Sequence, residues 1–133
     1  MGLPSCAPEK NGTLMSDKVM IVDDDPGIRE TLSALIDDLG YATVTAEDGL
    51  KACEAFEQGP FLCVFTDIMM PNMTGIELIK ELKGRDISTP VIVITGHASI
   101  EVAIDAMRHG ASDFISKPFK TKQIEFIINK VKR

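Results

Sequence analysis

The sequence predicts one α/β domain in which helices cover both faces of a doubly wound parallel sheet. Five short apolar runs recur along the chain, and segments with apolar residues at helical spacing separate them. Strands that are apolar throughout are buried on both faces, which is typical of parallel sheets between two helical layers. We therefore expect five βα units.

The ordered domain is expected over residues 17–133, after a segment without periodicity. Residues 1–16 are rich in Gly, Pro, Ser and Asn, as in a flexible tail or a cloning remnant. The first strand is expected over residues 18–23. Asp25 then supplies a helix N-cap, Pro26 occupies the first helical position, and Gly40 ends the helix.

The second and third units follow the same pattern. We expect a strand over residues 41–46 and a helix that is capped by Asp48 and reaches about residue 57. The third strand is expected over residues 61–66, and a loop over residues 67–74 follows it. The third helix is marked by apolar residues at helical spacing, which are Ile76, Ile79 and Leu82.

The last two units complete the pattern. Pro90 precedes a strand over residues 91–95, and a helix is expected over about residues 98–108, with Gly110 past its end. Residues 113–116 form a short fifth strand. The final helix has a buried stripe of Ile124, Ile127, Ile128 and Val131.

Right-handed crossovers between parallel strands lead to a doubly wound, flavodoxin-like (βα)5 sheet with strand order 2-1-3-4-5. In this order the first and third strands are neighbours. Asp23, Asp24 and Asp25 follow the first strand, and Asp67 follows the third. These carboxylates then meet at one edge of the sheet, where they repel one another unless a cation neutralises them. The arrangement indicates a metal site.

Composition excludes several classes of protein. The chain has 133 residues, 44% of them hydrophobic, and a net charge of −6, which suits one acidic globular domain. An acidic surface argues against nucleic-acid binding, and no apolar stretch approaches the roughly 20 residues that span a bilayer. Without a signal-peptide pattern, we expect a cytoplasmic protein. The cysteines Cys6, Cys53 and Cys63 lack disulfide or metal-ligand spacing.

Four groups of residues at expected strand ends resemble a known family. They are Val22-Asp23-Asp24-Asp25, Thr66-Asp67-Ile68-Met69-Met70-Pro71 with Gly75, Ile94-Thr95-Gly96, and Phe114-Ile115-Ser116-Lys117-Pro118-Phe119. In order and spacing they resemble the receiver domain of two-component response regulators. The resemblance covers about residues 18–132. It implies phosphoryl transfer from the phosphohistidine of a partner kinase to Asp67.

The resemblance and the chemistry of Mg²⁺ assign a role to each residue of the site. Mg²⁺ prefers oxygen ligands and keeps some waters, so we expect Asp24 and Asp67 as direct ligands and Asp23 as a water-mediated one. The backbone carbonyl of Met69 completes the set, whereas Asp25 only caps a helix. Lys117 and the Thr95 hydroxyl are expected to contact the phosphoryl oxygens. In the family pattern Lys117-Pro118 is a cis peptide.

The resemblance also implies a switch and a set of partners. Phe114 stands where an aromatic side chain swings inward when Thr95 moves onto the phosphoryl group. The switch would change the surface of the fourth helix, fifth strand and fifth helix, whose exposed residues are expected to be Glu101, Asp105, Arg108, Asp113, Lys122 and Lys130. We expect a sensor histidine kinase or phosphotransfer protein as partner, and a phosphorylation-enhanced homodimer or a heterologous output partner on this surface.

Two alternatives use similar residues. Haloacid-dehalogenase-like phosphatases also have an aspartate nucleophile, Mg²⁺ and a lysine, but they need a second aspartate two residues after the first, where this chain has Met69. A receiver-like docking domain without phosphorylation would lack a pocket residue, and none is missing. Glycine-rich nucleotide-binding motifs are absent as well. We therefore expect a phosphoacceptor that signals to an output domain or partner, and no enzyme.

Overall fold

The computed structural model describes residues 18–86, 88–96 and 99–132. The expected tail over residues 1–16 lies outside this part, as does Ala98, where the fourth helix was expected to begin. The described elements are β1 (Lys18–Val22), α1 (Pro26–Asp38), β2 (Ala42–Ala46), α2 (Gly49–Ala55), η2 (Phe56–Gln58), β3 (Cys63–Thr66), α3 (Gly75–Arg85), β4 (Val91–Thr95), α4 (Ile100–Arg108), β5 (Asp113–Ser116) and α5 (Thr121–Val131).

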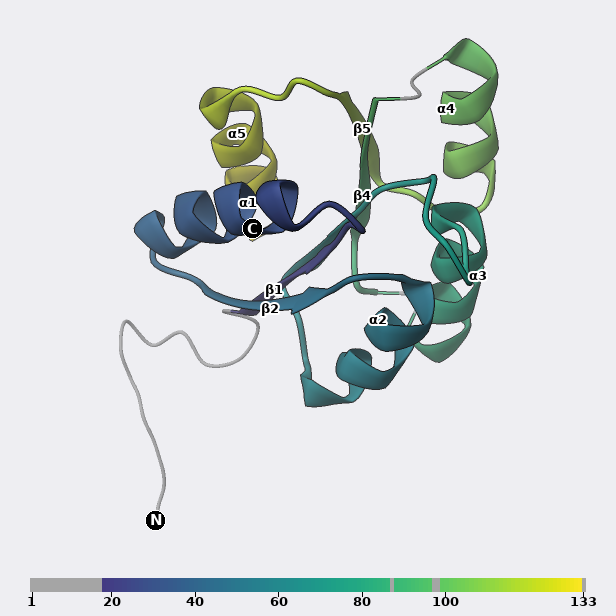
Figure 1. Cartoon of the computed structure of the whole chain (residues 1–133), viewed down its shortest axis with the longest axis horizontal. Helices are drawn as coiled ribbons and strands as arrows, with labels where there is room; N and C mark the ends of the chain where they lie inside the picture. Colours follow the sequence, from purple (N-terminus) through teal and green to yellow (C-terminus); the bar gives the residue numbers. More distant parts are fainter. Residues whose placement is uncertain (1–17, 87, 97–98, 133) are drawn as a thin grey trace.

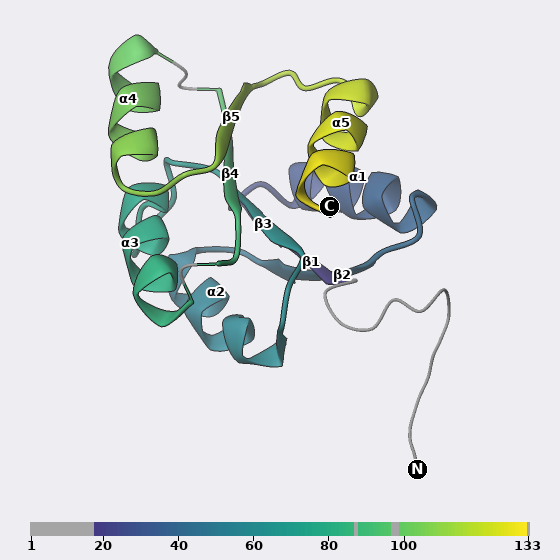
Figure 2. The ribbon, with the colours of Figure 1, turned by 180° about the vertical axis from the view of Figure 1, so that it is seen from behind.

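The strands form one parallel five-stranded sheet in the order β2-β1-β3-β4-β5, which confirms the predicted topology. Figure 2 shows β2 and β5 at the two edges of the sheet. In the register of β1 and β3, Val22 pairs with Thr66. Asp23 and Asp67, each one residue further on, therefore leave the sheet side by side.

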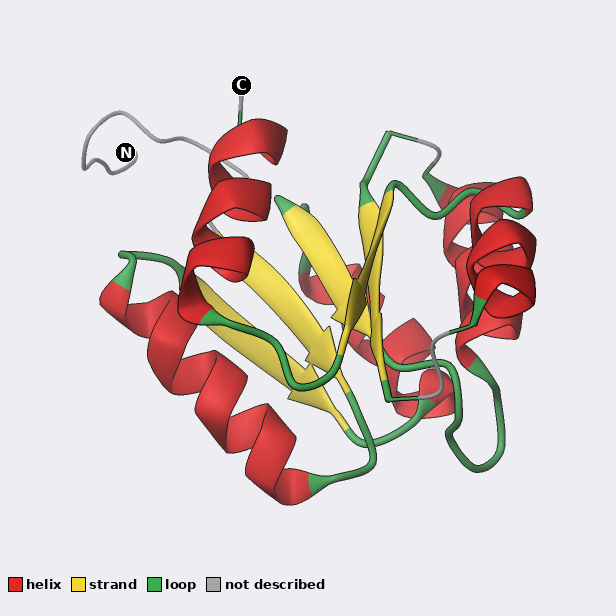
Figure 3. Ribbon diagram, turned by 90° about the horizontal axis from the view of Figure 1, so that it is seen from above, coloured by secondary structure: helices red, strands yellow, loops and turns green. Residues whose placement is uncertain are grey.

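Helices cover both faces of the sheet (Figures 1 and 3). α1 and α5 lie on one face, where Leu32, Ile36 and Ile124 pack on the sheet in one buried cluster. α2, α3 and α4 lie on the other face, where Leu78, Ile79 and Ala106 belong to a second cluster. β1, β3 and β4 are buried almost throughout, because each lies between two strands and two helical layers.

Several element ends differ from the prediction for local reasons. Gly40 has a left-handed φ of 98°, and the Tyr41 N–H returns to the Ile36 carbonyl (3.3 Å), so β2 begins one residue later than expected. α2 ends at Ala55, and the 3₁₀ turn η2 completes the expected length. β3 begins at Cys63, two residues later than expected. α4 begins at Ile100, because the Ser99 side chain caps it.

The predicted helix caps are confirmed. The Asp25 side chain accepts from the Gly27 N–H, and the Asp48 side chain accepts from the Lys51 N–H. A capping box between Thr74 and Glu77 starts α3. No helix in the described part of the chain is long and apolar enough to cross a membrane.

Candidate functional site

The site is built around Asp67 and Asp23 at the carboxyl edge of the sheet. The Asp67 N–H donates to the Val22 carbonyl (3.0 Å), and the Asp23 N–H donates to the Ala46 carbonyl (3.1 Å). Sheet-like hydrogen bonds thus hold the backbone of each aspartate just past its strand. Both residues are buried, with exposures of 6% and 3%. Buried carboxylates need compensating charge or hydrogen bonds.

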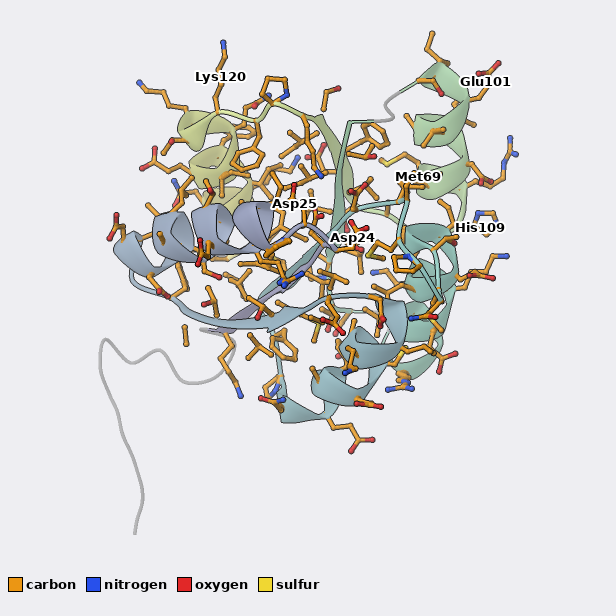
Figure 4. All side chains as sticks on the ribbon, viewed as in Figure 1. Asp24, Asp25, Met69, Glu101, His109 and Lys120 are labelled. Carbon is orange, nitrogen blue, oxygen red and sulfur yellow. The ribbon has the colours of Figure 1, made fainter. Side chains whose placement is uncertain are left out.

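Asp24 joins these two residues in a three-carboxylate cluster. One oxygen each from Asp23, Asp24 and Asp67 lies within 4.8 Å of the others. Asp24 is exposed, so the cluster opens to solvent on one side. Figure 4 shows Asp24 at the same end of the sheet as Met69. Three carboxylates with an open side fit a hard cation that prefers oxygen ligands and keeps some waters, as Mg²⁺ does.

Lys117 brings a positive charge to the two buried carboxylates. Its backbone N–H donates to the Thr95 carbonyl (2.9 Å), which places the residue just past β5. The Lys117 Nζ lies 2.8 Å from Asp23 Oδ2 and 3.0 Å from Asp67 Oδ2. The Lys117–Pro118 peptide is cis, as the family pattern predicts, and Gly59–Pro60 is a second cis peptide that was not predicted.

Burial and pairing act against each other in this cluster. Burial raises the pKa of Asp23, and the hydrogen bond from Lys117 offsets only part of this effect. Burial lowers the pKa of Lys117, but its hydrogen bonds to Asp23 and Asp67 outweigh that effect, so the net shift is upward. The lysine therefore stays protonated.

The backbone around Asp67 holds its carboxylate in one orientation. The Ile68 N–H donates to Asp67 Oδ1 (2.6 Å), and the Thr66 hydroxyl donates to the Asp67 carbonyl (2.9 Å). Gly75 packs against the same peptide, since a Cβ there would lie 2.2 Å from the Asp67 carbonyl oxygen. Only glycine allows this close approach.

Thr95 and Phe114 lie on neighbouring strands. Thr95 ends β4 and is fully buried, and Phe114 in β5 is half-buried against the core cluster under α2, α3 and α4. In the register of these strands Phe114 pairs with Val93, two residues before Thr95. Their side chains therefore belong to the same face of the sheet, because alternate residues along a strand share a face.

The surface of α4, β5 and α5 differs in part from expectation. Glu101, Arg108, Lys122 and Lys130 are exposed, but Asp105 and Asp113 are only half-exposed. Asp113 Oδ2 already pairs with Lys130 Nζ (3.1 Å) within the chain. α4 also carries an exposed apolar stripe of Ile100, Ile104 and Met107, with exposures of 78%, 50% and 47%. The helical spacing of these residues, together with Ala103, already places them on one face of the expected fourth helix, and the structure shows that this stripe is exposed.

Sequence reasoning also missed residues that support the site from neighbouring elements. Arg29 Nη1 donates to the Asp23 carbonyl (2.7 Å), so α1 is tied to the loop after β1. Asn72 Nδ2 donates to Asp48 Oδ2 (2.7 Å), so the loop after β3 is tied to α2. Asn72 and Asp48 lie 24 residues apart, so their contact has no local sequence signal, and the Arg29 contact depends on how α1 leaves the loop after β1.

Comparisons with known proteins identify the family. Residues 19–129 match the model of the response regulator receiver domain. The chain belongs to the receiver domains of two-component response regulators. The transcriptional regulatory protein FixJ of Bradyrhizobium diazoefficiens is 34% identical over 110 residues, which cover 83% of this chain and 54% of FixJ. The chain thus spans about half the length of this relative.

Solved structures agree with this assignment. The receiver domain of NtrX from Brucella abortus is 35% identical with a TM-score of 0.80, and the match covers 85% of this chain and 96% of that one. The beryllofluoride-activated NtrC4 receiver domain dimer is 32% identical with a TM-score of 0.81, and the match covers 86% of this chain and 95% of that one. Both share the five-stranded doubly wound fold.

Proposed function

We propose that Asp67 accepts a phosphoryl group from the phosphohistidine of a sensor histidine kinase or a phosphotransfer protein. The observation that best supports this role is the contact of Lys117 Nζ with both Asp23 and Asp67, at 2.8 and 3.0 Å. A carboxylate oriented at a strand end beside a fixed cation is suited to a reaction that adds negative charge there.

In the proposed transfer, an Asp67 carboxylate oxygen forms a P–O bond while the P–N bond of phosphohistidine breaks. The electron pair of the broken bond stays on the imidazole nitrogen. A carboxylate is a weak nucleophile, so positioning and charge stabilisation must supply most of the rate. The Ile68 N–H contributes to positioning, because it holds Asp67 Oδ1 at 2.6 Å.

Mg²⁺ is the proposed cofactor of this reaction. Asp24 and Asp67 would bind it directly, Asp23 would bind it through water, and the Met69 carbonyl would complete the protein ligands. When bound, the ion supplies positive charge to the phosphoryl oxygens. Lys117 would donate to the same oxygens, with the buried Thr95 hydroxyl as a second donor.

The proposed output is a change in the surface formed by α4, β5 and α5. Movement of Thr95 toward the phosphoryl group would leave space on the face of the sheet that it shares with Phe114, so the aromatic ring would turn inward. α4 follows Thr95 in the chain and packs loosely, with Ala106 as its only buried residue. Its exposed stripe would then meet an output domain, a heterologous partner or a second copy of this chain.

Labelling tests the phosphoacceptor. We expect Mg²⁺ and acetyl phosphate to add one acid-stable, base-labile phosphoryl group to the chain, as measured by intact mass. Asp67→Asn should abolish the addition. Asp38→Asn, which changes an exposed aspartate at the end of α1, should be labelled like the wild type. Equal labelling of Asp67→Asn and the wild type would contradict the assignment.

Sedimentation tests the output surface. We expect beryllofluoride with Mg²⁺ to convert monomer to dimer, and high salt to weaken the dimer because exposed charges on α4 and α5 take part. Ile104→Glu should prevent the conversion. Leu50→Glu is the matched control, because Leu50 on α2 is equally exposed (49% against 50%). A monomer under every condition would rule out self-association and leave a heterologous partner.

A further inference from the structure

The loop between β3 and α3 is tied at its tip to the first residues of α2. Asp48 caps α2 and is only 5% exposed. Its Oδ1 accepts from the Lys51 N–H (2.9 Å), and its Oδ2 accepts from Asn72 Nδ2 (2.7 Å). One carboxylate therefore serves two purposes, since the first bond starts a helix and the second joins that helix to the loop that follows Asp67.

Packing brings the same two segments together beside this hydrogen bond. A Cβ on Gly49 would lie 2.6 Å from the Met73 Cβ, so α2 and the loop tip are in close contact. One turn further along α2, Cys53 places its Sγ 3.9 Å from the Sδ of Met73. Asn72 itself has a left-handed φ of 69°, a conformation that Asn and Asp adopt more readily than other non-glycine residues.

A second anchor holds the base of the loop. The Gly75 N–H donates to the Ile68 carbonyl (2.9 Å), and the side chains of Ile68 and Met70 are buried. Met69 lies between the base and the tip, and its side chain is 54% exposed. Its position therefore depends on two anchors, of which the one at the tip is the contact of Asn72 with Asp48.

We propose that Asp48 is a positioning residue for Mg²⁺ binding: through Asn72 it holds the loop that carries the Met69 carbonyl. This inference rests on the proposed function, because Met69 is a proposed ligand. The hydrogen bonds from the Lys51 N–H and Asn72 lower the pKa of Asp48, so its carboxylate remains a charged acceptor in the neutral range. A fixed loop binds an ion without first losing conformational freedom.

The two hydrogen bonds of Asp48 can be separated by mutation. Ser is as good an N-cap as Asp, so Asp48→Ser keeps a bond to the Lys51 N–H but, with one short hydroxyl, removes the acceptor of Asn72. Asp48→Asn alone would not separate the two bonds, because the Asn72 amide can turn and accept from the new amide group. Asn72→Asp places two carboxylates opposite each other and keeps a residue type that tolerates the left-handed φ. The double variant Asp48→Asn with Asn72→Asp restores one donor and one acceptor with the wild-type net charge.

The test is a Mg²⁺ titration of the whole chain, followed by the amide NMR shifts of residues 67–75, together with amide exchange in the same loop. We expect Asp48→Ser and Asn72→Asp each to bind Mg²⁺ at least about tenfold more weakly, the size expected for a lost hydrogen bond to a charged group. Amide exchange around Met69 should become faster. The double variant should return to within about twofold of the wild-type affinity, a rescue that a general loss of stability could not produce.

Asp37→Asn is the charge control, because it removes one exposed carboxylate at the far end of α1. It should leave the affinity unchanged. Wild-type Mg²⁺ affinity in Asp48→Ser, or a double variant that binds no better than Asn72→Asp, would overturn the positioning role while the phosphoacceptor assignment stands. Absence of Mg²⁺ binding by the wild-type chain would overturn both the positioning role of Asp48 and the proposed Mg²⁺-dependent phosphoacceptor.

Discussion

Replacement of Lys117 by Met should destabilise the domain strongly in the absence of Mg²⁺. Lys117 Nζ lies 2.8 and 3.0 Å from two carboxylates whose side chains are only 4% and 8% exposed. At an effective dielectric constant of about 20, each pair attracts by roughly 5–6 kcal/mol. Desolvation offsets much of this attraction, but removal of one partner from a buried cluster leaves the other charges uncompensated. We expect a loss of about 3 kcal/mol in unfolding free energy at neutral pH.

The loss should depend on pH in a defined direction. Burial raises the pKa of Asp23 even with the lysine present, and removal of the lysine should raise it further. A raised carboxyl pKa means that ionisation costs stability, so the deficit of the variant should be small in acid, where Asp23 is protonated, and grow as the pH rises through the folded pKa of Asp23. The raised pKa of Lys117 implies that its own contribution persists up to its ordinary value of 10.5 and is lost above it.

Urea unfolding of Lys117→Met and the wild type, at acid and neutral pH and with or without Mg²⁺, measures these effects. Mg²⁺ should stabilise the variant more than the wild type, because the wild type already has a cation at the cluster. Lys80→Met removes an exposed lysine from α3 and should cost less than about 0.5 kcal/mol. A variant as stable as the wild type at neutral pH would refute the proposed balance of charges.

Two further substitutions test the site. Asp24→Asn should keep the fold, with an unfolding free energy equal to or slightly above that of the wild type because repulsion is relieved, yet bind Mg²⁺ at least about tenfold more weakly by NMR titration. Gly75→Ala should lower the unfolding free energy by more than about 2 kcal/mol in urea, because its Cβ would lie 2.2 Å from the Asp67 carbonyl. Gly84→Ala, in the same helix with nothing within 4 Å, should be neutral or stabilising.

Much of the site could be predicted because parallel α/β folds follow strict rules. Apolar runs located the strands, right-handed crossovers placed β1 beside β3, and that adjacency alone put Asp23 and Asp67 together. Asp25 and Asp48 were recognisable as caps, because a cap is a local pattern of one residue and the turn after it. The order of the elements and the position of the carboxylate cluster are therefore properties of the sequence.

The support around the cluster was decided only by the tertiary structure. Asp48 holds Asn72, which lies 24 residues further along the chain, and Arg29 on α1 holds the Asp23 carbonyl. Each contact joins two elements whose separation depends on helix packing and on the course of a loop. A residue's own neighbours in sequence carry no information about such a separation. The aspartates could thus be located from the order of the strands, whereas the residues that orient them became visible only once the helices and loops had their places around the sheet.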